Sequence, residues 1–265
     1  MTGDREIGRR RLEDETAIVT GASSGIGAAT ARELARQGAA VALAARRADV
    51  LEAQVQAITR EGGRAVAIRT DLQDPTQVTR LVERTVDAFG RVDVLVNAAG
   101  ASWTRPLAAT APEDVTRLVS VNLLGAIRLT HEVLPGMLER RHGAIVTVSS
   151  LAGRVAMEPL YSTTKYGLRG FSLALRRQLA GSGVSASLVS PGNIKTAMTS
   201  NVNARMPGPD LVAAKIAQLV VRPRREVVIP RIHYTLAWLE LLLPSLADVA
   251  HRKRNWARLE ETRTW

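Results

Sequence analysis

Short apolar runs alternate along the chain with longer stretches in which apolar residues recur every three or four positions. The short runs are rich in Val, Ile, Leu and Ala without clean alternation, which is typical of strands buried on both faces of a sheet. The longer stretches have the spacing of one helix face. Strands that alternate with helices are parallel, joined by right-handed crossovers and covered by helices on both faces. The predicted strands are 17–20, 40–45, 65–69, 92–97, 144–149, 185–190 and 226–230, and the predicted helices include 28–37, 50–61, 76–89, 112–140 and 161–179.

The chain is predicted to form one large domain with an extension at each end. It has 265 residues, 46% of them hydrophobic, and no linker-like stretch interrupts positions 16–230. We expect residues 16–231 to form a single α/β domain, a doubly wound parallel sheet of about seven strands with helices on both faces. Residues 1–15 are expected to be a mobile basic arm, and residues 232–265 an amphipathic C-terminal helical tail.

The C-terminal tail combines an apolar stretch with a basic end. The apolar run 232–243 contains Glu240 and is followed by Pro244 and Asp248, so it is too short and too interrupted to span a bilayer. It either packs on the body or on a partner protomer, or lies in a membrane interface beside its basic flank, or covers the site as a lid. All three alternatives remain open at this point.

Charge and cysteine content narrow the classes of function. The net charge of +11, from 36 Lys and Arg against 25 Asp and Glu, suits nucleic acid, an anionic membrane surface or a phosphate-rich ligand. The basic residues are dispersed and accompany no nucleic-acid-binding motif, so nucleic acid is not an expected partner. The chain has no cysteine and no secretory apolar core at its start, and we expect a cytoplasmic protein, with membrane association through the tail as an option. The histidines show no metal-binding spacing, so no metal is expected.

A glycine-rich turn directly follows the first predicted strand. Residues 20–27 read Thr-Gly-Ala-Ser-Ser-Gly-Ile-Gly, and a helical pattern follows them. Glycine permits a tight turn and lets the backbone approach a pyrophosphate on the N-terminus of the next helix. This order predicts a dinucleotide-binding domain of the Rossmann type. The expected contacts are Gly21, Ser23, Ser24, Gly25, Ile26 and Gly27.

A second ligand-binding segment, Asn97-Ala98-Ala99-Gly100, follows the fourth predicted strand. Carboxyl ends of parallel strands are where open sheets bind ligands. The segment is either a plain turn or a ligand contact, and the glycine turn after the first strand favours the ligand contact.

The segment with the most reactive combination of side chains contains Ser150, Tyr161 and Lys165. In a helix that begins near Tyr161, that residue and Lys165 share a face. The cation is predicted to lower the pKa of the tyrosine towards a range useful for acid/base chemistry. Ser150, at the end of the fifth predicted strand, can donate a hydrogen bond to a carbonyl oxygen that gains negative charge. The alternative is a solvated pair of side chains on a helix surface.

Together these motifs resemble those of the short-chain dehydrogenase/reductase family. The resemblance covers residues 16–196 in order, and also includes Asn122 and Pro191-Gly192. It implies that Tyr161 is the acid/base, that Ser150 polarises the carbonyl, that Lys165 binds the nicotinamide ribose and that Asn122 holds a water of a proton relay. The other cofactor contacts that it implies are Asp71 and Leu72 beside the adenine, Asn97, Ala98 and Gly100, and Pro191, Gly192, Ile194 and Thr196 around the nicotinamide.

Two features depart from the family pattern. Ala99 stands where the family often has a second asparagine, and we expect no consequence. The interval from Ser150 to Tyr161 is about two residues shorter than in many relatives. Ser149 is therefore a second, weaker candidate for the serine role. The register of Ser-Leu-Ala-Gly-Arg places the deletion in 155–160 and keeps Ser150.

Cofactor preference is predicted from the end of the second strand. Folds that use NAD place an acid there for the ribose hydroxyls, whereas a 2′-phosphate requires cations. Here Ala45 stands at that position, and Arg46 and Arg47 follow. Either the two arginines form a solvated loop, or they bind the 2′-phosphate; we expect the second, with NADP as the cofactor in preference to NAD.

Together, these features predict that the chain is an NADP(H)-dependent oxidoreductase that interconverts a carbonyl and an alcohol. Trp103, Met157, Met198 and Met206 lie near the expected substrate loops and favour an apolar substrate. The resemblance implies a homodimer or homotetramer. The alternatives are a dinucleotide-binding sensor or scaffold without turnover, and a basic protein that binds nucleic acid or a membrane.

Overall fold

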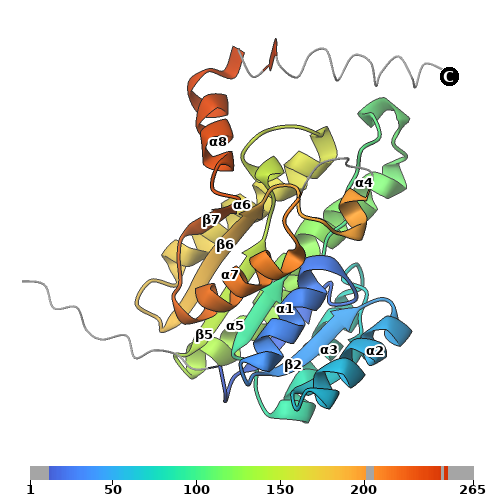
Figure 1. Ribbon diagram of the computed structural model, residues 1–265, viewed down its shortest axis with the longest axis vertical. Helices are drawn as coiled ribbons and strands as arrows, with labels where there is room; N and C mark the ends of the chain where they lie inside the picture. Colours follow the sequence, from blue (N-terminus) through green and yellow to red (C-terminus); the bar gives the residue numbers. More distant parts are fainter. Residues whose placement is uncertain (1–11, 201–205, 246–247, 250–265) are drawn as a thin grey trace, which may run out of the picture.

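Seven parallel strands form a single open sheet. The structure is a computed structural model that describes residues 12–200, 206–245 and 248–249. The sheet has the order β3-β2-β1-β4-β5-β6-β7, and the predicted doubly wound α/β fold is confirmed (Figure 1). The strands are β1 (Thr16–Thr20), β2 (Ala40–Ala45), β3 (Arg64–Arg69), β4 (Val94–Asn97), β5 (Gly143–Val148), β6 (Val184–Pro191) and β7 (Glu226–Ile229).

The strand order reverses between β1 and β4, which lie side by side in register from Ala17 with Val94 to Val19 with Val96. At such a switch point the loops from the two strands turn towards opposite faces and leave a crevice at the carboxyl edge. The loops after β1 and β4 therefore meet at this edge, although far apart in sequence.

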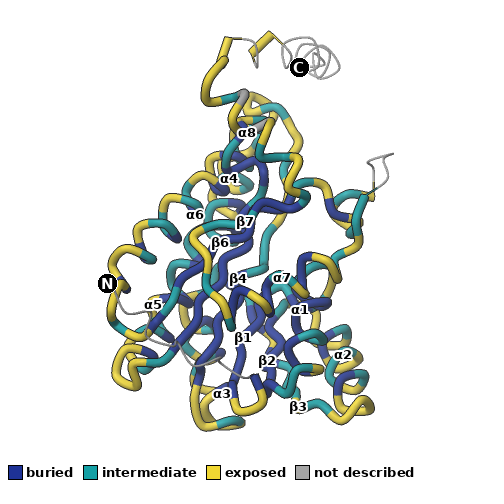
Figure 2. Tube along the Cα trace, turned by 60° about the vertical axis from the view of Figure 1, so that its left-hand side comes forward, coloured by how far each residue is buried: buried dark blue, intermediate teal, exposed yellow. Residues whose placement is uncertain are grey.

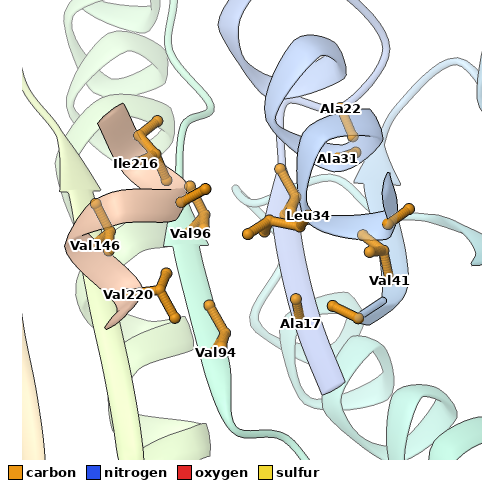
Figure 3. Packing of buried hydrophobic residues seen from close by; sticks show 14 of the residues in the cluster. Ala17, Ala22, Ala31, Leu34, Val41, Val94, Val96, Val146, Ile216 and Val220 are labelled. Carbon is orange, nitrogen blue, oxygen red and sulfur yellow. The ribbon is translucent and has the colours of Figure 1, made fainter. Parts of the chain in front are cut away.

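Helices cover both faces of the sheet. One apolar cluster packs α1, α2 and α7 on one face, and another packs α3, α5 and α6 on the opposite face. Figure 3 shows Ile216 and Val220 of α7 beside Val94, Val96 and Val146 of the sheet. The bounds are α1 (Gly25–Arg36), α2 (Ala48–Arg60), α3 (Pro75–Phe89), α4 (Pro112–Val119), α5 (Gly125–Glu139), α6 (Pro159–Gln178), α7 (Pro209–Val221) and α8 (His233–Leu242), with short turns η1 (Leu107–Ala109), η3 (Leu151–Gly153) and η4 (Ala197–Thr199).

The predicted helix 112–140 is not a regular α-helix. Between α4 and α5 lies η2 (Ser120–Leu124), a segment with π-helical hydrogen bonding. Such segments widen one turn and often occur at functional sites. Apolar periodicity did not reveal this interruption.

The end of the predicted N-terminal arm belongs to the packed domain. Leu12 is 3% exposed and lies in the core cluster, and the amide of Ala40 donates to the carbonyl of Glu15 at 2.9 Å. The prediction of a mobile arm is therefore wrong for residues 12–15, and residues 1–11 lie outside the described part.

The tail helix α8 stands at one end of the molecule, above β6 and β7 (Figure 1). Its first turn packs on the body, because the hydroxyl of Tyr234 donates to the carbonyl of Glu226 at 3.3 Å. Trp238 and Leu241 are 57% and 71% exposed, and Figure 2 shows this end mostly in the colour of exposed residues. Among the described helices, none is long and apolar enough to cross a membrane. The tail beyond residue 249 lies outside the described residues.

Candidate active site

The glycine turn after β1 allows unusually close backbone contacts. Gly21 has φ +67°, and a Cβ there would lie 2.9 Å from the Cα of Ala99. A Cβ on Gly27 would collide with the carbonyl of Gly21. The turn therefore packs against the loop after β4 and against the start of α1 with no room for side chains.

The N-terminus of α1 fits an anion. Ser24 precedes the helix, its side chain makes no capping hydrogen bond, and the first turn holds no acidic residue. The amides of a helix start need partners, and the helix dipole favours negative charge there. The glycine turn of residues 20–27, which we call the glycine cradle, and these amide donors together fit a dinucleotide pyrophosphate.

Two arginines stand at the outer end of this cradle. Arg46 and Arg47 follow β2, which ends at Ala45. The Arg47 guanidinium donates from Nη2 to the hydroxyl of Ser23 at 3.0 Å. The end of β2 and the glycine turn therefore meet in a positively charged region formed by Arg46, Arg47 and Ser23, which we call the cationic corner.

A cavity of about 550 Å³ runs along the carboxyl edge from this corner to the loop after β4. Asn97 does not line it; its amide donates to Thr130 at 3.1 Å, and it is buried. Of the predicted cofactor contacts, those that line the cavity are Gly21, Ser23, Ser24, Gly25, Ile26, Gly27, Arg46, Arg47, Asp71, Leu72, Ala98, Gly100 and Thr196.

The structure distinguishes the two adjacent serines after β5. The buried Ser149 donates its hydroxyl to the carbonyl of Lys165 at 2.9 Å. Ser150 caps η3 by accepting from the amide of Ala152 at 3.1 Å, and its side chain is near enough to Tyr161 to act on the pKa of that phenol. Geometry therefore favours Ser150 as the serine of the site.

Tyr161 and Lys165 share one face of α6, which begins two residues before the tyrosine. The Lys165 Nζ lies 5.7 Å from the centroid of the Tyr161 ring and donates to the carbonyl of Val148 at 3.3 Å. A Cβ on Gly100 would be 3.4 Å from this Nζ, so the ammonium lies beside the loop after β4.

The pKa of Tyr161 is shifted opposite to the sequence prediction. Burial raises the pKa of Tyr161 above its usual value, and the hydrogen bond with Ser150 acts only partly against this. Burial also lowers the pKa of Lys165 from 10.5 to about 8. The predicted lowering of the tyrosine pKa is wrong in this structure because desolvation of the phenolate is the larger effect.

Asn122 joins the π-helical segment to the loop after β4. Its Oδ1 accepts from the amide of Ala101 at 2.7 Å, and its Nδ2 donates to the carbonyl of the same residue at 2.9 Å. The Nδ2 also donates to the hydroxyl of Thr164 on α6 at 3.2 Å. Its amide thus ties the loop after β4 to α6 at the residue before Lys165.

The segment after β6 crosses the glycine cradle. Thr196 caps η4 together with Thr199, and its Cγ2 would be 3.2 Å from a Cβ on Gly25. Ile194 is buried. Gly192 lies directly against the imidazole of His233, so a Cβ at this position would collide with α8.

The predicted substrate residues separate into two groups. Trp103 and Met198 line the cavity, whereas Met157 packs against η3 and Met206 does not line the cavity. The Arg117 guanidinium, 6.0 Å from the Trp103 ring centroid, also lines it. Sequence reasoning missed Arg117, because it belongs to no motif and only the turn of α4 brings it there.

A cluster of ionisable side chains at the opposite edge was also not predicted. A carboxylate oxygen of Glu15, a carboxylate oxygen of Asp93 and a ring nitrogen of His142 lie within 4.8 Å of one another. The His142 Nε2 is 2.9 Å from Glu15, and Asp93 pairs with Arg91 at 2.9 Å. These contacts join the start of the domain to β4 and β5.

Comparison with known proteins places the chain among similar proteins of one family. The short chain dehydrogenase family model matches residues 15–207. Glycine betaine reductase ATRR of Emericella nidulans is 42% identical over 70% of this chain, a match that covers 15% of that protein. The 3-oxoacyl-[acyl-carrier-protein] reductase of Synechocystis sp. is 37% identical over 73% of this chain and 79% of its own length. The structure of a short chain dehydrogenase from Burkholderia cenocepacia J2315 in complex with NADP has a TM-score of 0.76 at 33% identity, over 83% of this chain and 98% of that one.

The family match covers most of the described chain, including the glycine turn, Tyr161 and Lys165. The relatives named above include a 3-oxoacyl reductase and a dehydrogenase that was solved in complex with NADP. The chain therefore belongs to the short-chain dehydrogenase/reductase family and is an NAD(P)-dependent oxidoreductase that acts on CH–OH groups.

Proposed function

We propose that the chain uses NADP(H) to interconvert a carbonyl and an alcohol on an apolar substrate, with Tyr161 as the acid/base. The observation that carries this proposal is the meeting of Ser150, Tyr161 and Lys165 beside Gly100, at the inner end of the glycine cradle. Trp103 and Met198 on the cavity wall support the apolar substrate.

Each side chain has one proposed role in carbonyl reduction. NADPH, when bound in this cavity, would supply the hydride. Tyr161, whose raised pKa keeps it protonated at neutral pH, donates its proton to the carbonyl oxygen, and Ser150 donates a hydrogen bond to the same oxygen. The ammonium of Lys165 then stabilises the tyrosinate. Alcohol oxidation returns the proton to Tyr161.

The test is a panel of carbonyls followed by absorbance of NADPH or NADH. We expect turnover of cyclohexanone, acetophenone or decanal to exceed that of pyruvate and dihydroxyacetone. Tyr161→Phe should lower kcat by about 10²–10⁴-fold, while NADPH binding, measured by its fluorescence, stays intact. Equal turnover by Tyr161→Phe contradicts the acid/base role, and turnover of polar carbonyls alone contradicts the apolar substrate.

NADP preference is proposed from the cationic corner of Arg46, Arg47 and Ser23. A charge-assisted hydrogen bond contributes roughly 1.5–3 kcal/mol. Replacing both arginines by alanine should therefore raise the Kd for NADPH on the order of 10–100-fold and leave the Kd for NADH nearly unchanged. Arg60→Ala, an exposed arginine on α2 outside the cavity, is the matched control. A double variant that keeps its NADPH affinity contradicts the proposal.

We also propose a peripheral membrane contact through α8. Its support is the exposure of Ile232, Trp238 and Leu241 at one end of the molecule, followed in sequence by the basic run 251–258. Apolar side chains beside cationic ones are the pattern of a helix that lies in a membrane interface.

A further inference from the structure

The carboxylate of Glu226 is the centre of a buried polar network. Glu226 begins β7, and its side chain is 5% exposed. Arg154 donates to its two oxygens from Nε at 2.6 Å and from Nη2 at 2.5 Å. Arg169 donates from Nε at 3.3 Å, and the hydroxyl of Ser190 donates at 2.9 Å. One carboxylate thus receives hydrogen bonds from three separate parts of the chain.

Each of the three donors is close in sequence to a residue of the active site. Arg154 directly follows η3, the turn that Ser150 caps. Arg169 lies on α6, one helical turn beyond Lys165. Ser190 is on β6, directly before Pro191. The network therefore connects the serine loop, the helix of Tyr161 and Lys165, and the segment expected to enclose the nicotinamide.

The first turn of α8 completes the network. The Tyr234 ring lies 5.5 Å from the Arg154 guanidinium. Its hydroxyl donates to the backbone carbonyl of Glu226 at 3.3 Å and accepts from the amide of Val228 at 3.3 Å. The neighbouring His233 packs on Gly192. Through these contacts α8 covers the network and touches the nicotinamide segment.

The network is ionic at neutral pH. Burial by itself raises the pKa of Glu226, but the hydrogen bond and charge of Arg154, the charge of Arg169 and the hydrogen bond of Ser190 outweigh it, and the pKa lies below its usual value. Arg154 is held charged in turn by its hydrogen bond with Glu226, which raises its pKa. A buried ion pair of this kind adds little net stability over apolar packing, yet breaking one side is costly. Conformational specificity is one established use of such pairs.

We propose that Glu226 is a positioning residue: its carboxylate holds the Ser150 loop and the Pro191–Gly192 segment in fixed relation to Tyr161 and Lys165, and Tyr234 of α8 closes this arrangement. The inference rests on the proposed function, because the roles of Ser150 and Tyr161 are assigned there. Catalytic hydrogen bonds tolerate little displacement, and an error of about 1 Å costs up to about 10²-fold in rate.

The test is Glu226→Gln in the full-length chain, with acetophenone and NADPH as probes. Glutamine keeps the size of the side chain but replaces one acceptor by a donor that faces an arginine. We expect kcat to fall about 10–100-fold, with the Kd for NADPH, from fluorescence, within about twofold. The isotope effect with deuterated NADPH should rise, because hydride transfer becomes slower. A kcat and an isotope effect equal to those of the wild type overturn the proposal.

Asp93→Asn is the matched control. Asp93 is also a buried carboxylate near two arginines, Arg91 at 2.9 Å and Arg140 at 3.7 Å, but it precedes β4 at the opposite edge of the sheet. We expect it to lower the melting temperature and leave kcat unchanged. An equal loss of kcat in both variants assigns the effect to general destabilisation and overturns the proposal.

A milder variant covers the case in which Glu226→Gln does not fold. Ser190→Ala removes the hydrogen bond from one uncharged donor and keeps the charges of Glu226, Arg154 and Arg169. It should lower kcat severalfold with the Kd for NADPH unchanged, and an unchanged kcat overturns the proposal. If the wild-type chain turns over no carbonyl on the panel, the proposed function fails and this inference fails with it. Turnover that Glu226→Gln leaves intact refutes the inference alone.

Discussion

Lys165 is a basic residue in a buried position, where it is only 4% exposed. Its Nζ donates to one backbone carbonyl, that of Val148, and burial lowers its pKa from 10.5 to about 8. A residue retained for chemistry can reduce the stability of the fold around it. Lys165 is expected to be such a residue.

Lys165→Met should make the chain more stable at pH 7. Between about pH 8 and 10.5 the unfolded chain binds more protons at this lysine than the folded chain, so the stability of the wild type rises with pH in this window. Below pH 8 the buried lysine is charged in the folded chain, and this charge lowers the free energy of unfolding by on the order of 3 kcal/mol. The variant's advantage should therefore be largest at pH 7 and shrink towards pH 10. Denaturant unfolding at both pH values measures it, and a variant that is less stable at pH 7 contradicts the prediction.

At the scale of elements, the start of α1 depends on backbone approach. Gly27 lies in the first turn of the helix, where the carbonyl of Gly21 occupies the space of a side chain. The turn and the helix can present their amides to one phosphate group only while this contact is kept.

Gly27→Ala should therefore weaken NADPH binding at least about tenfold and destabilise the fold by about 1–3 kcal/mol, the usual cost of overpacking. Gly170→Ala is the matched control, because Gly170 lies on α6 with open space around it. That change should leave NADPH binding intact and raise stability by up to about 1 kcal/mol through helix propensity. Fluorescence titration and thermal unfolding measure both. NADPH affinity equal to the wild type in Gly27→Ala contradicts the prediction.

Two elements were predicted incompletely for physical reasons. The π-helical segment around Asn122 is only five residues long, so an apolar periodicity judged over about 11–18 residues does not detect it. The start of the domain at Leu12 was missed because a short charged segment gives no periodic signal, while its burial depends on the core that it meets.

At the scale of the whole molecule, the cavity is lined by residues at the carboxyl side of the sheet. The helix α8 follows the carboxyl end of β7 and stands at the same side (Figure 1). The crossover connections bring the ends of β1, β4, β5 and β6 to this edge. The exposed apolar residues of α8 lie at the same end, so a surface bound by α8 would be near the cavity that we propose for an apolar substrate.

The chain should sediment with vesicles that contain phosphatidylglycerol more than with pure phosphatidylcholine, and less as salt rises. Trp238→Ser combined with Leu241→Ser should reduce this binding severalfold. Leu107→Ser, an exposed leucine on η1, is the control and should bind as the wild type does. Equal binding by the double variant excludes α8 as the contact.

The sequence by itself determined the fold class, the cradle and the candidate acid/base. These are local properties: strand and helix periods differ, glycine alone tolerates the backbone of the turn, and Tyr161 and Lys165 are separated by one helical turn. Strands that alternate with helices leave little choice but a parallel sheet. The match with the family's motifs then indicated the reaction.

Only the tertiary structure decided which side chains meet and how they ionise. Arg47 reaches Ser23, Asn122 holds Ala101, and Arg154 reaches Glu226, which is 72 positions away in sequence. No local pattern encodes such contacts, because they depend on how the crossovers place distant loops together. The raised pKa of Tyr161 follows from burial, which is a property of the packed surroundings and not of the residue.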